Sequence, residues 1–201
     1  MLVGMVLLAL LLGLARADAP PTVQDGRLDS LTRRPLAGRP VLDLRAAASS
    51  AGDGVTPDRP AFCVAGLPHR RIVLEGCGNG SGLFHHADAP ELAHFRGAAV
   101  LVDHSQGALD LSLLLGAGLA ELQVAADEAG FKTGAARSAD QVEAAGPEAS
   151  MGFKGRWWGL PGAYLVGDIN VGAAHLPAAP AVLGRGGTLL PFATIGVGVG
   201  F

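Results

Sequence analysis

The last 13 residues of the chain, LLPFATIGVGVGF, alternate between apolar and small side chains. Three of the four even positions from 194 to 200 are glycine, and the odd positions hold Ala193, Ile195, Val197, Val199 and Phe201. A period of two indicates a β-strand, because successive side chains of a strand point to opposite faces. One face of this strand is therefore apolar, and the other is almost bare.

The same alternation recurs along most of the chain. Residues 109–122 place Leu109 and the following odd positions on one face, with Asp110 and Ser112 on the other. A helix is the alternative for this segment, but Gly116 and Gly118 would each cost a helix about 1 kcal/mol. The pattern predicts an all-β protein with eight strands, at residues 40–48, 61–66, 70–77, 93–104, 108–124, 147–158, 163–175 and 189–201.

The connections between these segments alternate in length. Those near 67–69, 105–107 and 159–162 are short, whereas those near 49–60, 78–92, 125–146 and 176–188 are long and rich in Gly, Pro, Ala and Asp. Strict alternation of short turns and long loops is typical of an up-and-down antiparallel barrel. An even strand number also places both ends of the barrel on the same side.

The terminal strand resembles the last strand of bacterial outer-membrane barrels, which ends on an aromatic residue preceded by apolar residues at alternate positions. The matching residues here are Phe201, Val199, Val197 and Ile195. With the strand pattern, they make residues 40–201 similar to the small eight-stranded barrels of the OmpA and OmpX type. The resemblance implies a transmembrane barrel in the outer membrane of a Gram-negative bacterium, in contact with its lipid. It also implies that the barrel-assembly machinery reads the last strand as an insertion signal.

The amino-terminal segment has the features of a targeting signal. Its apolar run from Leu2 to Ala15 is too short to span a membrane as a helix, and Ala15 and Ala17 form the small-x-small pattern after which a signal peptidase cleaves, before Asp18. Residues 1–17 are therefore predicted to be a signal peptide, and residues 18–39 a periplasmic leader. An uncleaved anchor is the alternative, because neither Lys nor Arg precedes the apolar run.

In a membrane barrel the apolar face points to lipid and the polar face points inward. The predicted inner face carries equal numbers of acidic and basic residues, which predicts a filled lumen rather than a selective pore. Lys154 and Arg156 are expected to pair with Asp168 across a short turn. The ten charged residues predicted to face the lumen are Asp43, Arg45, Arg71, Glu75, Arg96, Asp110, Glu148, Lys154, Arg156 and Asp168.

The sequence contains two cysteines, Cys63 and Cys77. A lone pair in an exported chain predicts a disulfide. Both cysteines belong to the predicted inner face of neighbouring strands, but a simple hairpin register does not align them. A bulge or slip is needed to bring them together.

The sequence contains no pattern that predicts a catalytic centre, a cofactor site or a metal site. A lipid A deacylase would place His and Ser two residues apart on one strand face, whereas His104 and Ser105 are adjacent and point to opposite faces. His85, His86 and Asp88 lie together in a long loop, where a solvated loop is favoured over a metal site. A net charge of −3 argues against nucleic acid as a partner.

These observations favour a structural role, or contact with an unidentified surface ligand through the outer loops. Two other kinds of function remain open at this point. One is a lipid-modifying outer-membrane enzyme, and the other is a soluble periplasmic barrel that binds an apolar ligand.

Overall fold

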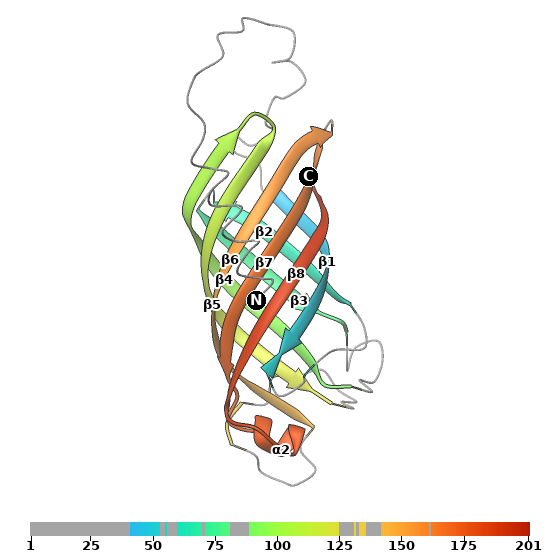
Figure 1. Ribbon diagram of the computed structural model, residues 1–201, viewed down its shortest axis with the longest axis vertical. Helices are drawn as coiled ribbons and strands as arrows, with labels where there is room; N and C mark the ends of the chain where they lie inside the picture. The colour runs from blue at the N-terminus through green and yellow to red at the C-terminus, as the bar shows by residue number, and fades with distance from the viewer. Residues whose placement is uncertain are drawn as a thin grey trace, which may run out of the picture. The chain divides into compact units, whose positions relative to one another are not determined.

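The computed structural model describes residues 41–52, 55, 60–69, 71–80, 89–124, 131, 133–135, 142–160 and 162–201. The eight strands in this part of the chain form a closed barrel, in which each strand pairs antiparallel with its sequence neighbours and the last pairs with the first (Figure 1). The all-β, up-and-down fold predicted from the alternation is therefore confirmed. The strands are β1 (Val41–Ala51), β2 (Ala61–His69), β3 (Ile72–Gly78), β4 (Glu91–Gln106), β5 (Leu109–Gln123), β6 (Glu143–Leu160), β7 (Ala163–His175) and β8 (Leu189–Gly200).

The predicted strand boundaries agree with these bounds to within four residues. The largest difference is at β6, which begins at Glu143 because residues 143–147 continue to pair with β5 beyond the point where pairing with β7 ends. The helical alternative for residues 109–122 is wrong, since β5 is a strand paired on both edges. The predicted signal peptide and leader lie outside the described residues.

The strand ends that the short turns join and the strand ends that lead into the long connections lie at opposite ends of the barrel, as Figure 1 shows. The turn end, at the top of the figure, also holds the carboxyl terminus, where Leu42 and Phe201 exchange two backbone hydrogen bonds of 3.0 and 3.1 Å. The loop end carries a short helix, α2 (Ala179–Leu183), between β7 and β8. No helix in the described part of the chain has the length and apolar character needed to cross a membrane.

Three register shifts interrupt the ladders, each near a short turn. They lie between Gly66 and His69 in β2, between Val100 and Val102 in β4, and after Trp157 in β6. A bulge of this kind adds a residue to one strand and reverses the facing of the residues beyond it. The shift in β4 therefore explains why the alternation of its sequence is blurred at Val100 and Val102.

The outer surface of the barrel is apolar and its interior is polar. Phe62 and Val197, on the outer face, are each 68% exposed, whereas the interior residues Asp43 and Lys154 are 0% and 1% exposed. A soluble barrel has the opposite arrangement, because water favours charged groups at the surface and apolar groups in the core. The sequence alternation thus gives each strand one apolar outer face and one polar inner face.

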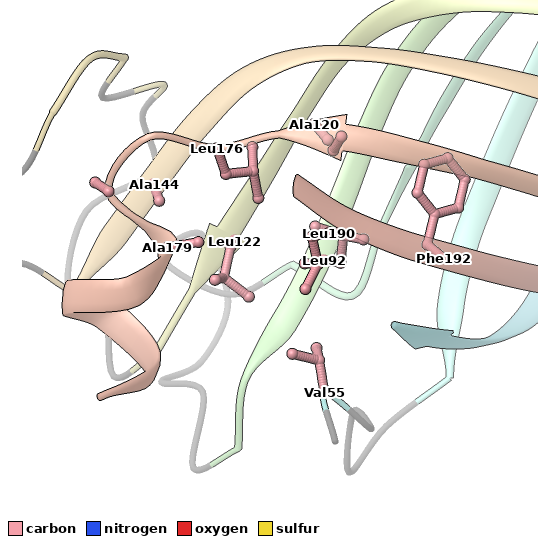
Figure 2. Packing of buried hydrophobic residues seen from close by; sticks show 11 residues of the cluster. Val55, Leu92, Ala120, Leu122, Ala144, Leu176, Ala179, Leu190 and Phe192 are labelled. Carbon is pink, nitrogen blue, oxygen red and sulfur yellow. The ribbon is translucent and has the colours of Figure 1, made fainter. Parts of the chain in front are cut away.

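At the loop end a cluster of apolar side chains is buried. Strands β4 to β8 direct buried apolar side chains inward there, and α2 and the flanking loops pack against them (Figure 2). We call this group the loop-end cluster. Its members are Val55, Leu92, Ala120, Leu122, Ala144, Ala174, Leu176, Ala178, Ala179, Leu190 and Phe192.

Candidate functional site

The charged interior between the loop-end cluster and the turn end is the part of the described structure in which the predicted site residues meet. Arg71 is not among them: the prediction that it faces the lumen is wrong, because β3 begins at Ile72 and Arg71 lies in the exposed β2–β3 turn. The other nine predicted lumen residues are buried, namely Asp43, Arg45, Glu75, Arg96, Asp110, Glu148, Lys154, Arg156 and Asp168.

Arg45 connects two carboxylates on different strands of this interior. From β1 its guanidinium donates one hydrogen bond to Glu75 on β3 and another to Asp168 on β7. Glu75 also accepts two hydrogen bonds from Arg96 on β4, the one from Nε with an N–O distance of 3.0 Å. Four strands are thereby connected through charge-assisted hydrogen bonds between buried side chains, which are stronger than hydrogen bonds between neutral groups.

The glycines of β8 make room for this arrangement. In the ladders, Gly198 lies opposite Arg45 on β1, and Gly196 lies opposite Asp168 on β7. A Cβ atom on Gly196 would stand 2.5 Å from Oδ1 of Asp168, and one on Gly198 would stand 2.6 Å from Cα of Arg45. The bare face of the terminal strand is therefore the space across which Arg45 reaches Asp168.

The predicted pairing of Lys154 and Arg156 with Asp168 is wrong. Lys154 is the cross-strand neighbour of Asp168, but its Nζ lies 3.2 Å from Oδ2 of Asp43 and 3.7 Å from Oε2 of Glu75. Arg156 also contacts Asp43, at 3.4 Å. These long side chains span the narrow interior to β1 and β3, whereas Asp168 is occupied by Arg45.

Two aromatic residues close the interior near the turn end. The Tyr164 hydroxyl donates a hydrogen bond to Asp43, and the Trp158 indole donates one to Asp110 at 2.6 Å. Their rings pack at a centroid distance of 4.3 Å. Neither residue is among the predicted lumen residues, although each occupies an even-numbered, inward-facing position like those of Arg156 on β6 and Asp168 on β7.

A histidine supplies the partner of Glu148, the last of the predicted lumen carboxylates. Nδ1 of His94 on β4 contacts Oε2 of Glu148 on β6, and both side chains are buried. The His94 ring also lies 4.5 Å from the ring of Phe192, a member of the loop-end cluster. His94 is on the predicted inner face of its strand, so the alternation could have placed it with the lumen residues.

The predicted disulfide is confirmed. Cys63 and Cys77 are direct partners in the β2–β3 ladder, with 4.1 Å between their Cα atoms and a bond between their sulfurs. The register shift between Gly66 and His69 supplies the bulge that this pairing requires. Both cysteines lie at interior positions, where Cys63 packs with Ala47 and Ala61.

The four residues of the predicted insertion signal lie on the outer face of β8 and at its end. Ile195, Val197, Val199 and Phe201 are exposed, between 41% and 68%. They form one side of the apolar outer surface, as alternation requires. Their recognition by an assembly machinery stays a prediction.

The residues considered for catalysis do not come together in the described structure. His104 and Ser105 are both exposed. They pair with Leu111 and Asp110 of β5, and their side chains lie on opposite faces of the β4–β5 hairpin. The loop residues His85, His86 and Asp88 lie outside the described residues. Among the residues that are described, no three His, Cys, Asp or Glu side chains are grouped in a way that could hold a metal ion.

Solved structures with a similar fold identify the type of barrel. The chain is similar to the neisserial surface protein A (NspA), with a TM-score of 0.50 and 11% identity over 80% of this chain and 94% of that one. The fold is that of a small eight-stranded outer-membrane β-barrel. The N-terminal β-barrel domain of Pseudomonas aeruginosa OprF also matches, with a TM-score of 0.44 and 11% identity over 80% of this chain and 97% of that domain. No protein-family model matches the sequence, and no curated protein matches it.

Proposed function

We propose that this chain is an integral outer-membrane protein of a Gram-negative bacterium, exported by the signal peptide at residues 1–17. In this proposal the lumen is filled, and the protein acts as a structural element or in surface contact through its long loops. The observation that carries the proposal is the inverted distribution of side chains, with an apolar outer surface around a charged interior.

The outer surface supports a lipid environment. Exposed apolar residues follow each other along the outer face of every strand, among them Phe62 on β2, Leu115 on β5 and Ile195 on β8. In water, so large a continuous apolar surface would favour aggregation. In a bilayer it replaces lipid–lipid contacts and carries no such cost. The same distribution argues against a soluble barrel that holds an apolar ligand, since its interior would have to be apolar.

The interior supports a filled lumen. An eight-stranded barrel encloses only enough space for its own side chains, and here Arg45 and Lys154 extend across that space to carboxylates on distant strands. The Trp158–Tyr164 pair narrows the turn end, and the loop-end cluster occupies the other end. A selective pore would keep an open path dominated by charges of one sign. We therefore expect poor conductance.

If the lumen is filled, the long loops are the part of the protein that performs its function. The enzyme alternative has no support from His104 and Ser105, which face opposite ways. The four long connections all leave the barrel at the loop end, which in an outer-membrane orientation is the cell surface. A surface ligand of these loops, and contact with the barrel-assembly machinery during biogenesis, are parts of this proposal.

The test combines location, folding and conductance. Cells are fractionated, the detergent-extracted protein is run on a gel with and without boiling, and the pure protein is reconstituted in a planar bilayer beside an open porin as control. We expect the protein in the outer-membrane fraction, a mobility shift on boiling, and no steady conductance steps. Recovery in the soluble periplasmic fraction would contradict the membrane proposal. Large, steady steps would contradict the filled lumen alone.

A further inference from the structure

We propose that the Cys63–Cys77 disulfide is formed before the barrel closes, while the β2–β3 hairpin is still an open chain, by a protein of the thiol–disulfide oxidase class. The proposal depends on the proposed function only because it assumes export into an oxidising compartment. The rest of the argument depends on the positions of the two sulfurs in the fold.

Both cysteines occupy interior positions of the closed barrel. Cys63 is 3% exposed and packs with the interior alanines Ala47 and Ala61, and Cys77 is half-buried beside it. Oε1 of Glu75 lies 3.7 Å from Sγ of Cys77, and this carboxylate is held by Arg45 and Arg96. The disulfide therefore lies against the charged interior and not on the outer surface.

The strands that carry the cysteines are enclosed on both edges. In the ladders, β2 pairs with β1 and β3, and β3 pairs with β2 and β4. Disulfide exchange requires an attacking thiolate to approach a sulfur directly. The two cysteines pair one ladder position inside the loop-end limit of β2 and β3. To reach their sulfurs, an oxidase or reductase protein would have to bring its active site inside an eight-stranded barrel, whose interior holds side chains or at most one small ligand. The folded barrel therefore excludes this class of enzyme from the bond.

The open hairpin has no such obstacle. The cysteines are separated by 14 positions in the sequence, so the loop that must close is short. In the exchange, the thiolate of one cysteine attacks the oxidase disulfide and forms a mixed disulfide. The thiolate of the other then attacks that bond and releases the oxidase as a dithiol. The chain loses two electrons and two protons in total, and the oxidase disulfide gains them.

Early formation also has a structural consequence. The bond fixes Cys63 opposite Cys77 and so selects the bulged register of the hairpin. That register places Glu75, two residues before Cys77, opposite Ala65 and next to Arg96 in the β4 ladder. A closed β2–β3 hairpin would thus enter barrel assembly with the main carboxylate of the interior already in position.

The experiment compares the bond in the folded and unfolded chain. Oxidised protein, either folded in liposomes or unfolded by dilution from urea without detergent, is treated with thioredoxin and its reductant. Free thiols are counted over time by alkylation and mass spectrometry. As a matched control, the Cys63→Ala/Cys77→Ala chain carries Ser105→Cys at the exposed turn end, joined as a mixed disulfide to a small thiol. We expect the folded wild type to be reduced at least a hundredfold more slowly than the unfolded chain, while the control is reduced rapidly when folded.

The reverse reaction completes the test. Chain that is folded in the reduced state should keep both thiols when an oxidase protein is added afterwards, whereas the unfolded chain should be oxidised by the same protein. Equal rates for folded and unfolded chain, in either direction, would overturn the proposal. If the reduced chain does not fold at all, the bond is required before closure, which supports the proposed order. Fractionation tests the membrane assignment separately, so the two proposals fail in different experiments.

Discussion

Replacing Asp168 with alanine removes one end of the bridge that Arg45 makes across the bare face of β8. Both side chains of this pair are almost completely buried, at 1% and 2% exposure. Arg45 keeps Glu75 in the variant, but its Nη1 loses the carboxylate, and the amide of Asn170 loses an acceptor at 2.8 Å. Breaking a buried pair by removing one partner costs about 3–5 kcal/mol. We expect the Asp168→Ala variant to lose this much free energy of unfolding.

The assay is reversible unfolding by urea in liposomes, followed by tryptophan fluorescence. Asp103→Ala is the matched control, because this carboxylate is exposed at the turn end and accepts one hydrogen bond from Ser112 at 3.0 Å. Its removal should cost about 1 kcal/mol or less. The double variant Arg45→Ala/Asp168→Ala should lose less than the sum of its single variants, since the two residues interact directly. Equal stabilities of Asp168→Ala and Asp103→Ala would refute the reasoning, because they would mean that water reaches the pair.

Three further predictions concern the disulfide, the glycine face and the terminal residue. Replacing both Cys63 and Cys77 with alanine should lower the free energy of unfolding by about 3 kcal/mol, as expected for a loop of about 15 residues; an unchanged urea midpoint would contradict this. Gly196→Val should lower the free energy of unfolding by about 1–3 kcal/mol, because the valine side chain would overlap the buried carboxylate of Asp168. Gly187→Ala is the control: no atom lies within 4 Å of its added Cβ, so the same urea titration should show no change. Deleting Phe201 should slow assembly in cells, measured by pulse-chase, and a Phe201→Ala chain that keeps the two terminal backbone hydrogen bonds should be slowed as well; normal assembly of both chains would rule out the aromatic signal.

The strands and their order could be predicted because each depends on local sequence. Alternation of apolar and polar residues assigns the two faces of a strand, and turn residues divide one strand from the next. The interior pairs could not be predicted in the same way. Lys154 and Asp168 are cross-strand neighbours, yet each finds its partner elsewhere. The lengths of the side chains and the narrowness of the barrel decide those contacts, and neither is visible in one strand at a time.

The remaining errors have similar physical causes. Arg71 follows the inward parity of β3, but alternation does not show where a strand ends, and this residue falls in the turn. His94, Trp158 and Tyr164 share the inward parity of the charged residues beside them on their strands. Their positions therefore follow from alternation, whereas a pattern of Asp, Glu, Lys and Arg alone does not indicate them.

Two adjacent tryptophans offer the most direct test of the central claim, which is that the apolar outer surface faces lipid while the interior is closed to it. Trp157 points outward and is 45% exposed, whereas Trp158 points inward, is 7% exposed and donates a hydrogen bond to Asp110. The measurement is fluorescence quenching of the Trp158→Phe and Trp157→Phe variants, each with one tryptophan, in bilayers that contain brominated lipid. We predict strong quenching of Trp157 by the lipid bromines and weak quenching of Trp158. Equal quenching, or stronger quenching of Trp158, would contradict the account.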